Sequence, residues 1–109
     1  MATFDDFMKL DIRVGTITEA KVFAKARKPA YQLVVDFGEE IGTKKSSAQI
    51  TQHYTPDQLI RRQVVAVVNF PPRKIADFMS EVLVLGTYSE GGVVLITPDK
   101  AVKNGDRLG

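Results

Sequence analysis

Apolar residues occur in short runs along the chain, and the runs follow the two-residue period of β-strands. Tyr31, Leu33, Val35 and Phe37 alternate with their neighbours in one segment, and residues 11–23 show a similar alternation. Residues 64–68, 81–85 and 93–96 are apolar almost throughout, as strands buried on both faces are. Residues 44–51 are more polar and fit a half-exposed strand. The chain is therefore predicted to be all-β.

The composition also favours strands over helices. Val, Ile and Thr total 28 residues, whereas Leu and Ala total 16, and β-branched side chains suit a pleated sheet better than a helix. In the first strand the apolar alternation shifts by one residue at Gly15, since Ile12 and Val14 precede it and Ile17 follows it. A glycine at such a shift predicts a β-bulge or the corner of a barrel.

Two short helices are predicted from their first residues. Residues 55–58, Thr-Pro-Asp-Gln, form a capping box that opens a helix through Ile60. A similar N-cap at Thr3 predicts a helix at the N-terminus. The apolar face of that helix would carry Phe4, Phe7 and Met8. About five short strands with one helix between the third and the fourth match an OB-fold, a Greek-key β-barrel with short helices.

The length and the N-terminus of the chain narrow its class. A chain of 109 residues is long enough for one compact domain, so residues 1–109 are predicted to form a single domain. No apolar run approaches the ~20 residues that a membrane helix needs, and the acidic N-terminus does not resemble a signal peptide. With no cysteines to form disulfides, we expect a cytoplasmic protein that does not insert into membranes.

The residues give little support for catalysis or metal binding. His53 is the only histidine, and it cannot form a zinc site without several carboxylate partners. Residues 42–46 are superficially similar to a phosphate-binding loop, but no glycine stands directly before the lysine. Asp36, Asp77 and Glu81 have no identifiable partner for acid–base work. We therefore expect no enzyme activity, no metal and no cofactor.

Basic residues stand in groups, although the formal net charge of the chain is only +2. The groups lie at residues 25–28, 44–45, 61–62 and 73–74, each beside predicted turn or loop residues. Two interpretations stay open. The groups are solvated loop tips that aid solubility, or they form an anion-binding surface if the fold brings several of them to one face.

Residues 69–74, Asn-Phe-Pro-Pro-Arg-Lys, directly follow a predicted buried strand. The two prolines stiffen this segment, which would present Asn69, Arg73 and Lys74 together for hydrogen bonds and phosphate contacts. Phe70 would offer a stacking face to a ligand or would belong to the core. Because aromatic residues at strand ends usually pack inward, we expect Phe70 in the core.

Six sequence blocks carry a resemblance to a known family. They are residues 10–17 (LDIRVGTI), 34–38 (VVDFG), 46–51 (SSAQIT), 54–59 (YTPDQL), 67–74 (VVNFPPRK) and 79–85 (MSEVLVL). These blocks cover nearly the whole chain, and they resemble the tRNA-binding domain family, within it the branch of CsaA-type export-related chaperones. The resemblance implies an OB-fold, a homodimer and no catalysis.

The third strand separates two branches of this family. Domains appended to aminoacyl-tRNA synthetases typically read Arg-x-Ile-Val-Ser-Gly-Ile there, whereas residues 44–50 of this chain read Lys-Lys-Ser-Ser-Ala-Gln-Ile. This difference favours the CsaA branch. Carried over by motif, the resemblance implies three groups of binding residues: Lys44, Lys45, Ser46, Ser47 and Gln49; Asn69, Phe70, Arg73 and Lys74; Phe78, Met79, Ser80 and Glu81.

Two functions stay open on this resemblance. CsaA-type relatives are associated with unfolded or precursor polypeptides and the export machinery, whereas synthetase-appended relatives recognise folded tRNA by shape and backbone. A peptide groove would be lined by Phe70, Phe78 and Met79, since such side chains tolerate varied partners. Its hydrogen bonds to the peptide backbone would come from Gln49, Asn69 and Ser80. A tRNA would instead contact the lysine and arginine groups.

Apolar residues near both chain ends support the implied homodimer. They are Phe4, Phe7 and Met8 at one end and Val102 and Leu108 at the other. A barrel of this size has little spare core for them, so we expect them to be buried against a second copy across a two-fold axis.

Overall fold

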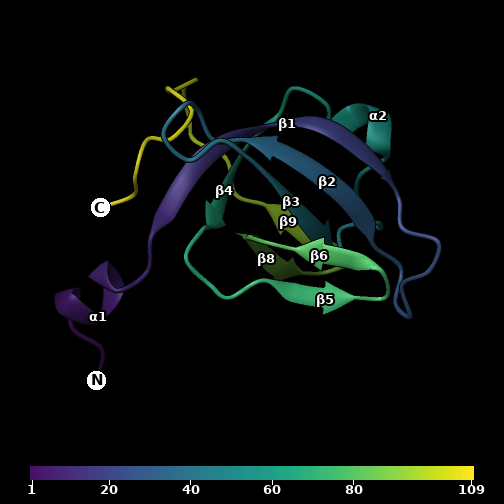
Figure 1. The fold of residues 1–109 in the computed structure, drawn as a ribbon, viewed down its shortest axis with the longest axis horizontal. Helices are drawn as coiled ribbons and strands as arrows, with labels where there is room; N and C mark the ends of the chain where they lie inside the picture. Colours follow the sequence, from purple (N-terminus) through teal and green to yellow (C-terminus); the bar gives the residue numbers. More distant parts are fainter.

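The computed structural model describes residues 1–109, which form a curved five-stranded sheet and two hairpins (Figure 1). The sheet order is β3-β2-β1-β4-β7, and all neighbouring strands are antiparallel. Its strands are β1 (Ile12–Val22), β2 (Tyr31–Asp36), β3 (Thr43–Ala48), β4 (Gln63–Val67) and β7 (Leu83–Val84). The hairpins pair β5 (Arg73–Ile75) with β6 (Phe78–Ser80) and β8 (Gly86–Ser89) with β9 (Gly92–Leu95), and the helices are α1 (Phe4–Met8) and α2 (Pro56–Leu59). The predicted all-β OB-fold class with short helices is confirmed.

The sheet nearly closes into a barrel where β3 meets the segment between β6 and β7. The Glu81 amide donates to the Lys45 carbonyl at 2.8 Å, and the hydroxyl of buried Ser46 donates to the Val82 carbonyl at 2.9 Å. Because β3 and β7 are the two edges of the sheet, these bonds bring its edges together.

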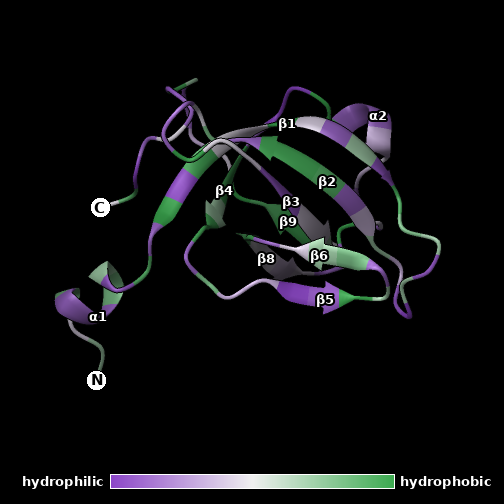
Figure 2. Ribbon diagram, in the orientation of Figure 1, coloured by the Kyte–Doolittle hydropathy of each residue, from purple (hydrophilic) through white to green (hydrophobic).

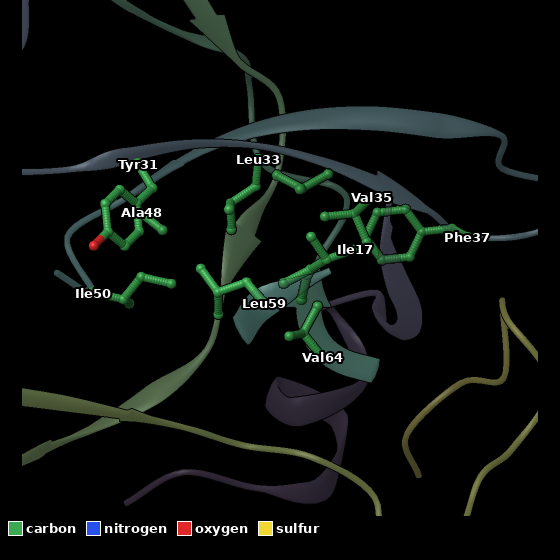
Figure 3. Close-up of a cluster of buried hydrophobic side chains, with 11 residues drawn as sticks. Ile17, Tyr31, Leu33, Val35, Phe37, Ala48, Ile50, Leu59 and Val64 are labelled. Carbon is green, nitrogen blue, oxygen red and sulfur yellow. The ribbon is translucent and has the colours of Figure 1, made fainter. Parts of the chain in front are cut away.

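Two apolar clusters lie on opposite faces of the sheet. Along β4, Val64 and Ala66 belong to an inner cluster of 11 buried residues, whereas Val65 and Val67 belong to a smaller outer cluster. Figure 3 shows the inner cluster, which fills the barrel. The prediction that residues 64–68 form a strand buried on both faces is confirmed for β4.

Close packing requires the glycine at position 15, and the β-bulge predicted as one of two alternatives is not at this residue. β1 pairs with β4 in continuous register through this glycine, and the register shift lies further on, between Ile17 and Glu19. A Cβ at Gly15 would lie 2.7 Å from Cδ1 of Phe37 and 2.7 Å from Cγ1 of Val35. The apolar pattern shifts here because the residues before the glycine face the outer cluster and those after it face the inner cluster.

Both helices begin at their predicted caps. The Thr55 amide donates to Oε1 of Gln58 at 3.0 Å, and α2 runs to Leu59, which is fully buried in the inner cluster. Thr3 and Asp6 form the reciprocal capping box of α1, which lies to one side of the barrel (Figure 1). Neither helix is long and apolar enough to cross a membrane.

The C-terminal segment pairs with the first half of β1. The Leu108 amide donates to the Ile12 carbonyl at 2.9 Å, and Val14 exchanges backbone bonds with Gly105 and Asp106. Leu108 packs on the outer cluster, as does Phe7 of α1. Both chain ends therefore border the same apolar surface.

Residues 73–80 form the β5–β6 hairpin, so the last two residues of the stiff segment predicted over residues 69–74 lie in a strand. The turn consists of Ala76 and Asp77, and Ala76 has a φ of 53°. Hairpin turns of this length usually carry glycine or asparagine at such a position, so the sequence lacks the ordinary signal. The strand predicted over residues 81–85 is reduced to β7, and β8 was not predicted.

Candidate functional site

The outer face of β1, β2 and β3 provides the floor of a groove. Paired residues form two rows across the three strands: Glu19, Val34 and Lys45, then Lys21, Gln32 and Ser47. Directly paired residues project from the same face of a sheet. Leu33, on β2 between these rows, is fully buried in the inner cluster, so the rows face outward.

Phe78 of β6 forms the wall of this groove. Its ring meets the ring of Phe23 edge-on, with centroids 5.3 Å apart, and Nζ of Lys45 lies 5.4 Å from its centroid. A small cavity of about 200 Å³, the Phe78 pocket, lies between this ring and the sheet. It is lined by Glu19, Ala20, Lys21, Gln32, Leu33, Val34, Lys45 and Phe78. The pocket therefore combines an apolar half with two ammonium groups and the one carboxylate of Glu19.

An ion pair ties the hairpin to the loop between β1 and β2. Nζ of Lys25 lies 2.8 Å from Oδ2 of Asp77 in the hairpin turn, and both side chains are largely exposed. The hydrogen bond and the charge of Lys25 hold the pKa of Asp77 below its ordinary value, and the same contact raises the pKa of Lys25. The pair and the contact between Phe23 and Phe78 join the same two segments, so they hold the hairpin over the sheet.

The ion pair predicts a specific titration. In the native protein the Asp77 carboxyl should titrate below 3.8, and Lys25→Ala should move its midpoint back toward 3.8. Because the folded-state pKa is lowered, the contribution of Asp77 to stability is present above pH 3.8 and is lost as the pH falls through the folded-state pKa. NMR of the side-chain carboxyl carbon measures the midpoint. Lys28→Ala, in the same loop, is the control and should leave it unchanged.

The predicted residues of β3, β6 and Glu81 meet along one seam. The Ser47 amide donates to Oγ of Ser80 at 3.0 Å, and the Lys45 amide donates to Oε1 of Glu81 at 3.0 Å. Ser46 is only 1% exposed, and its hydroxyl is bonded to the Val82 carbonyl. Ser46 is thus part of the barrel closure and does not face a ligand, which corrects its assignment.

Phe78 and Met79 project from opposite faces of the hairpin. Met79 pairs with Lys74, whereas Phe78 pairs with Ile75, and successive residues of a strand alternate between faces. Met79 is 40% exposed and does not line the Phe78 pocket. One groove lined by Phe70, Phe78 and Met79, as predicted, is therefore not present.

The other predicted residues have separate surroundings. Asn69 holds the start of β1, because its side chain donates to the Lys9 carbonyl at 2.8 Å and accepts from the Asp11 amide at 2.9 Å. Phe70 is 43% exposed, so the expectation that it lies in the core is wrong; its strand has already ended and a proline follows. Exposed positions are also occupied by Gln49, Arg73 and Lys74, and Lys44 is half-buried.

The sequence analysis missed the residues of β1 and β2 that line the pocket. Glu19, Lys21 and Gln32 are polar residues that alternate with apolar residues along β1 and β2. This alternation predicts that their side chains face outward. A wider polar cleft of about 890 Å³ lies elsewhere and contains no predicted residue. It includes Arg13, whose hydrogen bond to Asp11 raises the pKa of its guanidinium. No group of three or more metal-binding side chains is present.

Comparison with known proteins identifies the family of this chain and relatives that match nearly all of it. Residues 12–107 match the family described as tRNA binding domain. The chain is 43% identical over 106 residues to a methionine–tRNA ligase of Parabacteroides distasonis, a match that spans 96% of this chain and 15% of that protein. The crystal structure of a CsaA chaperone protein from Picrophilus torridus superposes with a TM-score of 0.95 at 54% identity and covers 100% of both chains. A chaperone CsaA from Bacillus anthracis gives a TM-score of 0.93 at 54% identity, covering 100% of this chain and 99% of that one.

Proposed function

The chain belongs to the tRNA binding domain family, and from this premise we propose that it is a non-catalytic, CsaA-like chaperone that binds unfolded or precursor polypeptides. The observation that carries the proposal is the likeness over the full length of both chains to a CsaA chaperone protein, at 54% identity. The methionine–tRNA ligase is matched over only 15% of its length, and its catalytic activity is not carried over. The proposed setting is the cytoplasm, with the export machinery as a further partner.

The groove supports a polypeptide ligand. The Phe78 pocket holds about 200 Å³, which suits a single side chain. Phe78 and Val34 offer apolar contact, and Lys21 and Lys45 attract an acidic group. The Phe78 ring already contacts the Phe23 ring edge-on and has the Lys45 ammonium over it, so less of the ring is open to stacking by a nucleobase.

Binding of an unfolded protein tests this function. The protein should bind reduced, carboxymethylated lactalbumin, which cannot fold, and should not bind native lactalbumin. Phe78→Ala should weaken binding about tenfold, because the variant removes apolar contact worth about 1.4 kcal/mol. Fluorescence anisotropy measures the affinity, and circular dichroism checks the fold. Tyr88→Ala is the matched control, since Tyr88 is a fully exposed aromatic residue on the other hairpin. Equal binding by both variants would contradict the role of Phe78.

The homodimer is part of the proposed function. The outer cluster itself is buried, but two large apolar side chains beside it are exposed. Leu83, which pairs with Val67 of the cluster, is 47% exposed, and Phe4, whose ring lies 6.5 Å from that of Phe7, is 69% exposed. Surface of this kind is suited to burial against a second copy.

Light scattering tests the dimer. The expected mass is about 24 kDa, twice the 12.1 kDa of one chain. Leu108→Asp should lower it toward the mass of a monomer, because the variant puts a charge into the outer cluster. A mass of one chain at micromolar concentration for the unmodified protein would reject the dimer.

Folded tRNA is the second candidate ligand, and the family match favours it. Lys21 and Lys45 lie on the groove floor, Lys25 lies at its end, and Arg73 and Lys74 are exposed on the hairpin. This arrangement brings three of the four basic groups of the sequence to one side of the barrel. A competition titration of the labelled peptide against tRNA tells whether the two ligands share the groove.

A further inference from the structure

An extended polypeptide must satisfy its own backbone hydrogen-bonding groups when it leaves water. Two of the side chains expected to supply these bonds are occupied. Asn69 is bonded to the backbone of Lys9 and Asp11, and Oγ of Ser80 accepts from the Ser47 amide. The polypeptide therefore needs another source of hydrogen bonds beside the groove.

The outer edge of β5 is such a source. β5 pairs with β6 and with no other strand. In an antiparallel ladder the bonded pairs alternate, so part of the N–H and C=O groups of a strand point away from its single partner. Ile75 and Phe78 flank the two-residue turn and bond across it, which leaves the backbone of Lys74 directed outward. The side chains of Arg73 and Lys74 are exposed along this edge.

We propose that an extended polypeptide binds by adding a third strand to the β5–β6 hairpin at the outer edge of β5. This inference rests on the proposed polypeptide-binding function and specifies how the ligand is held. Main-chain hydrogen bonds do not depend on the ligand's side chains, so any sequence preference must come from the residues that flank the edge. Side chains on one face of the added strand lie beside Ile75 and the groove, and those on the other face lie beside Lys74 and Met79.

Charge selects the occupant of this edge. β5 is the most hydrophilic strand of the hairpin (Figure 2), because two of its three residues are Arg73 and Lys74. A second copy of β5 would place like charges opposite one another, which is unfavourable. A segment with acidic residues complements the edge. The occupant is therefore an extended, acidic segment of a polypeptide and not a second copy of this chain.

A scan with backbone-methylated peptides tests strand addition without changing the protein. The probe is a fluorescein-labelled peptide, SEVTLTVES, methylated at one backbone amide at a time. Amides that face β5 should each lose about fivefold in affinity when methylated, whereas the amides between them should lose little. The expected result is a two-residue period along the middle of the peptide. Binding of the parent peptide with no such period overturns strand addition alone; failure of the parent peptide and of unfolded lactalbumin to bind overturns the proposed function.

Proline substitutions test the edge from the side of the protein. Lys74→Pro removes an outward amide and should weaken the parent peptide at least fivefold relative to Lys74→Ala, which removes the same charge and keeps the amide. Tyr88→Pro, at the corresponding outward position of the other exposed hairpin, is the matched control and should leave the affinity unchanged. Circular dichroism checks that the proline variants fold. If a variant does not fold, the scan with methylated peptides decides whether strand addition occurs. Equal peptide affinity in folded Lys74→Pro and Lys74→Ala overturns the proposal. If Lys74→Pro loses dimer formation or tRNA binding and keeps its affinity for the peptide, the edge is assigned to that partner.

Discussion

Phe37→Ala is expected to lower the free energy of unfolding by about 3–5 kcal/mol. Phe37 is fully buried in the inner cluster, and its ring lies where a Cβ of Gly15 would otherwise be. The neighbouring residues Ile17, Val35 and Val64 belong to paired strands, which limits how far they can collapse into the space that the ring leaves. Small domains are stable by only about 5–15 kcal/mol, and the loss is a large part of that.

Urea denaturation followed by circular dichroism measures this loss. The matched control is Phe70→Ala, which removes the same side chain from a position that is 43% exposed. Its effect should stay below about 1 kcal/mol. Equal losses in the two variants would contradict the placement of Phe37 in the core and of Phe70 at the surface.

The burial of Phe37 was predictable from the sequence, whereas the exposure of Phe70 was not. Phe37 continues the alternation of β2, and a periodic pattern specifies which face is buried. Phe70 follows a strand but belongs to no pattern, and the general tendency of aromatic residues gives the wrong answer for it. The capping box of α2 was likewise predicted correctly because its signal lies within residues 55–58.

The β5–β6 hairpin escaped prediction because its strands are three residues long and its turn lacks glycine. Patterns of period two need longer segments to be recognised. The hairpin brings Phe78 over the sheet, so most of the groove depends on an element that the sequence does not reveal.

The groove floor could not be read from the sequence for a related reason. Lys45 neighbours Glu19 only through the register of β1, β2 and β3, and register depends on how the whole sheet pairs. Family motifs locate residues along the chain but not the direction in which they point. For this reason the motif blocks included Ser46 and Asn69, whose side chains are bonded within the fold.

If the protein binds tRNA, raising the salt concentration from about 50 to about 200 mM should weaken the complex roughly a hundredfold. The net charge of the chain is only +2, so binding must come from local groups. On the groove floor and the hairpin, Lys21, Lys45, Arg73 and Lys74 would neutralise on the order of four phosphates. Each contributes a slope of about −0.7 to −0.9 in log affinity against log salt.

Charge-reversal variants assign this slope to the groove. Lys45→Glu and Arg73→Glu should each weaken tRNA binding and flatten the salt dependence by about one phosphate. Lys103→Glu is the matched control, because Lys103 lines the separate polar cleft and should affect binding far less.

A neutral, apolar peptide should lose little affinity over the same salt range, because apolar contact and main-chain hydrogen bonds release few counterions. Binding of tRNA that is insensitive to salt, or equal binding of unfolded RNA of the same length, would exclude recognition of tRNA through its backbone and shape. The groove would then be assigned to polypeptides alone, since the edge of β5 and the Phe78 pocket need no phosphate to hold an extended chain.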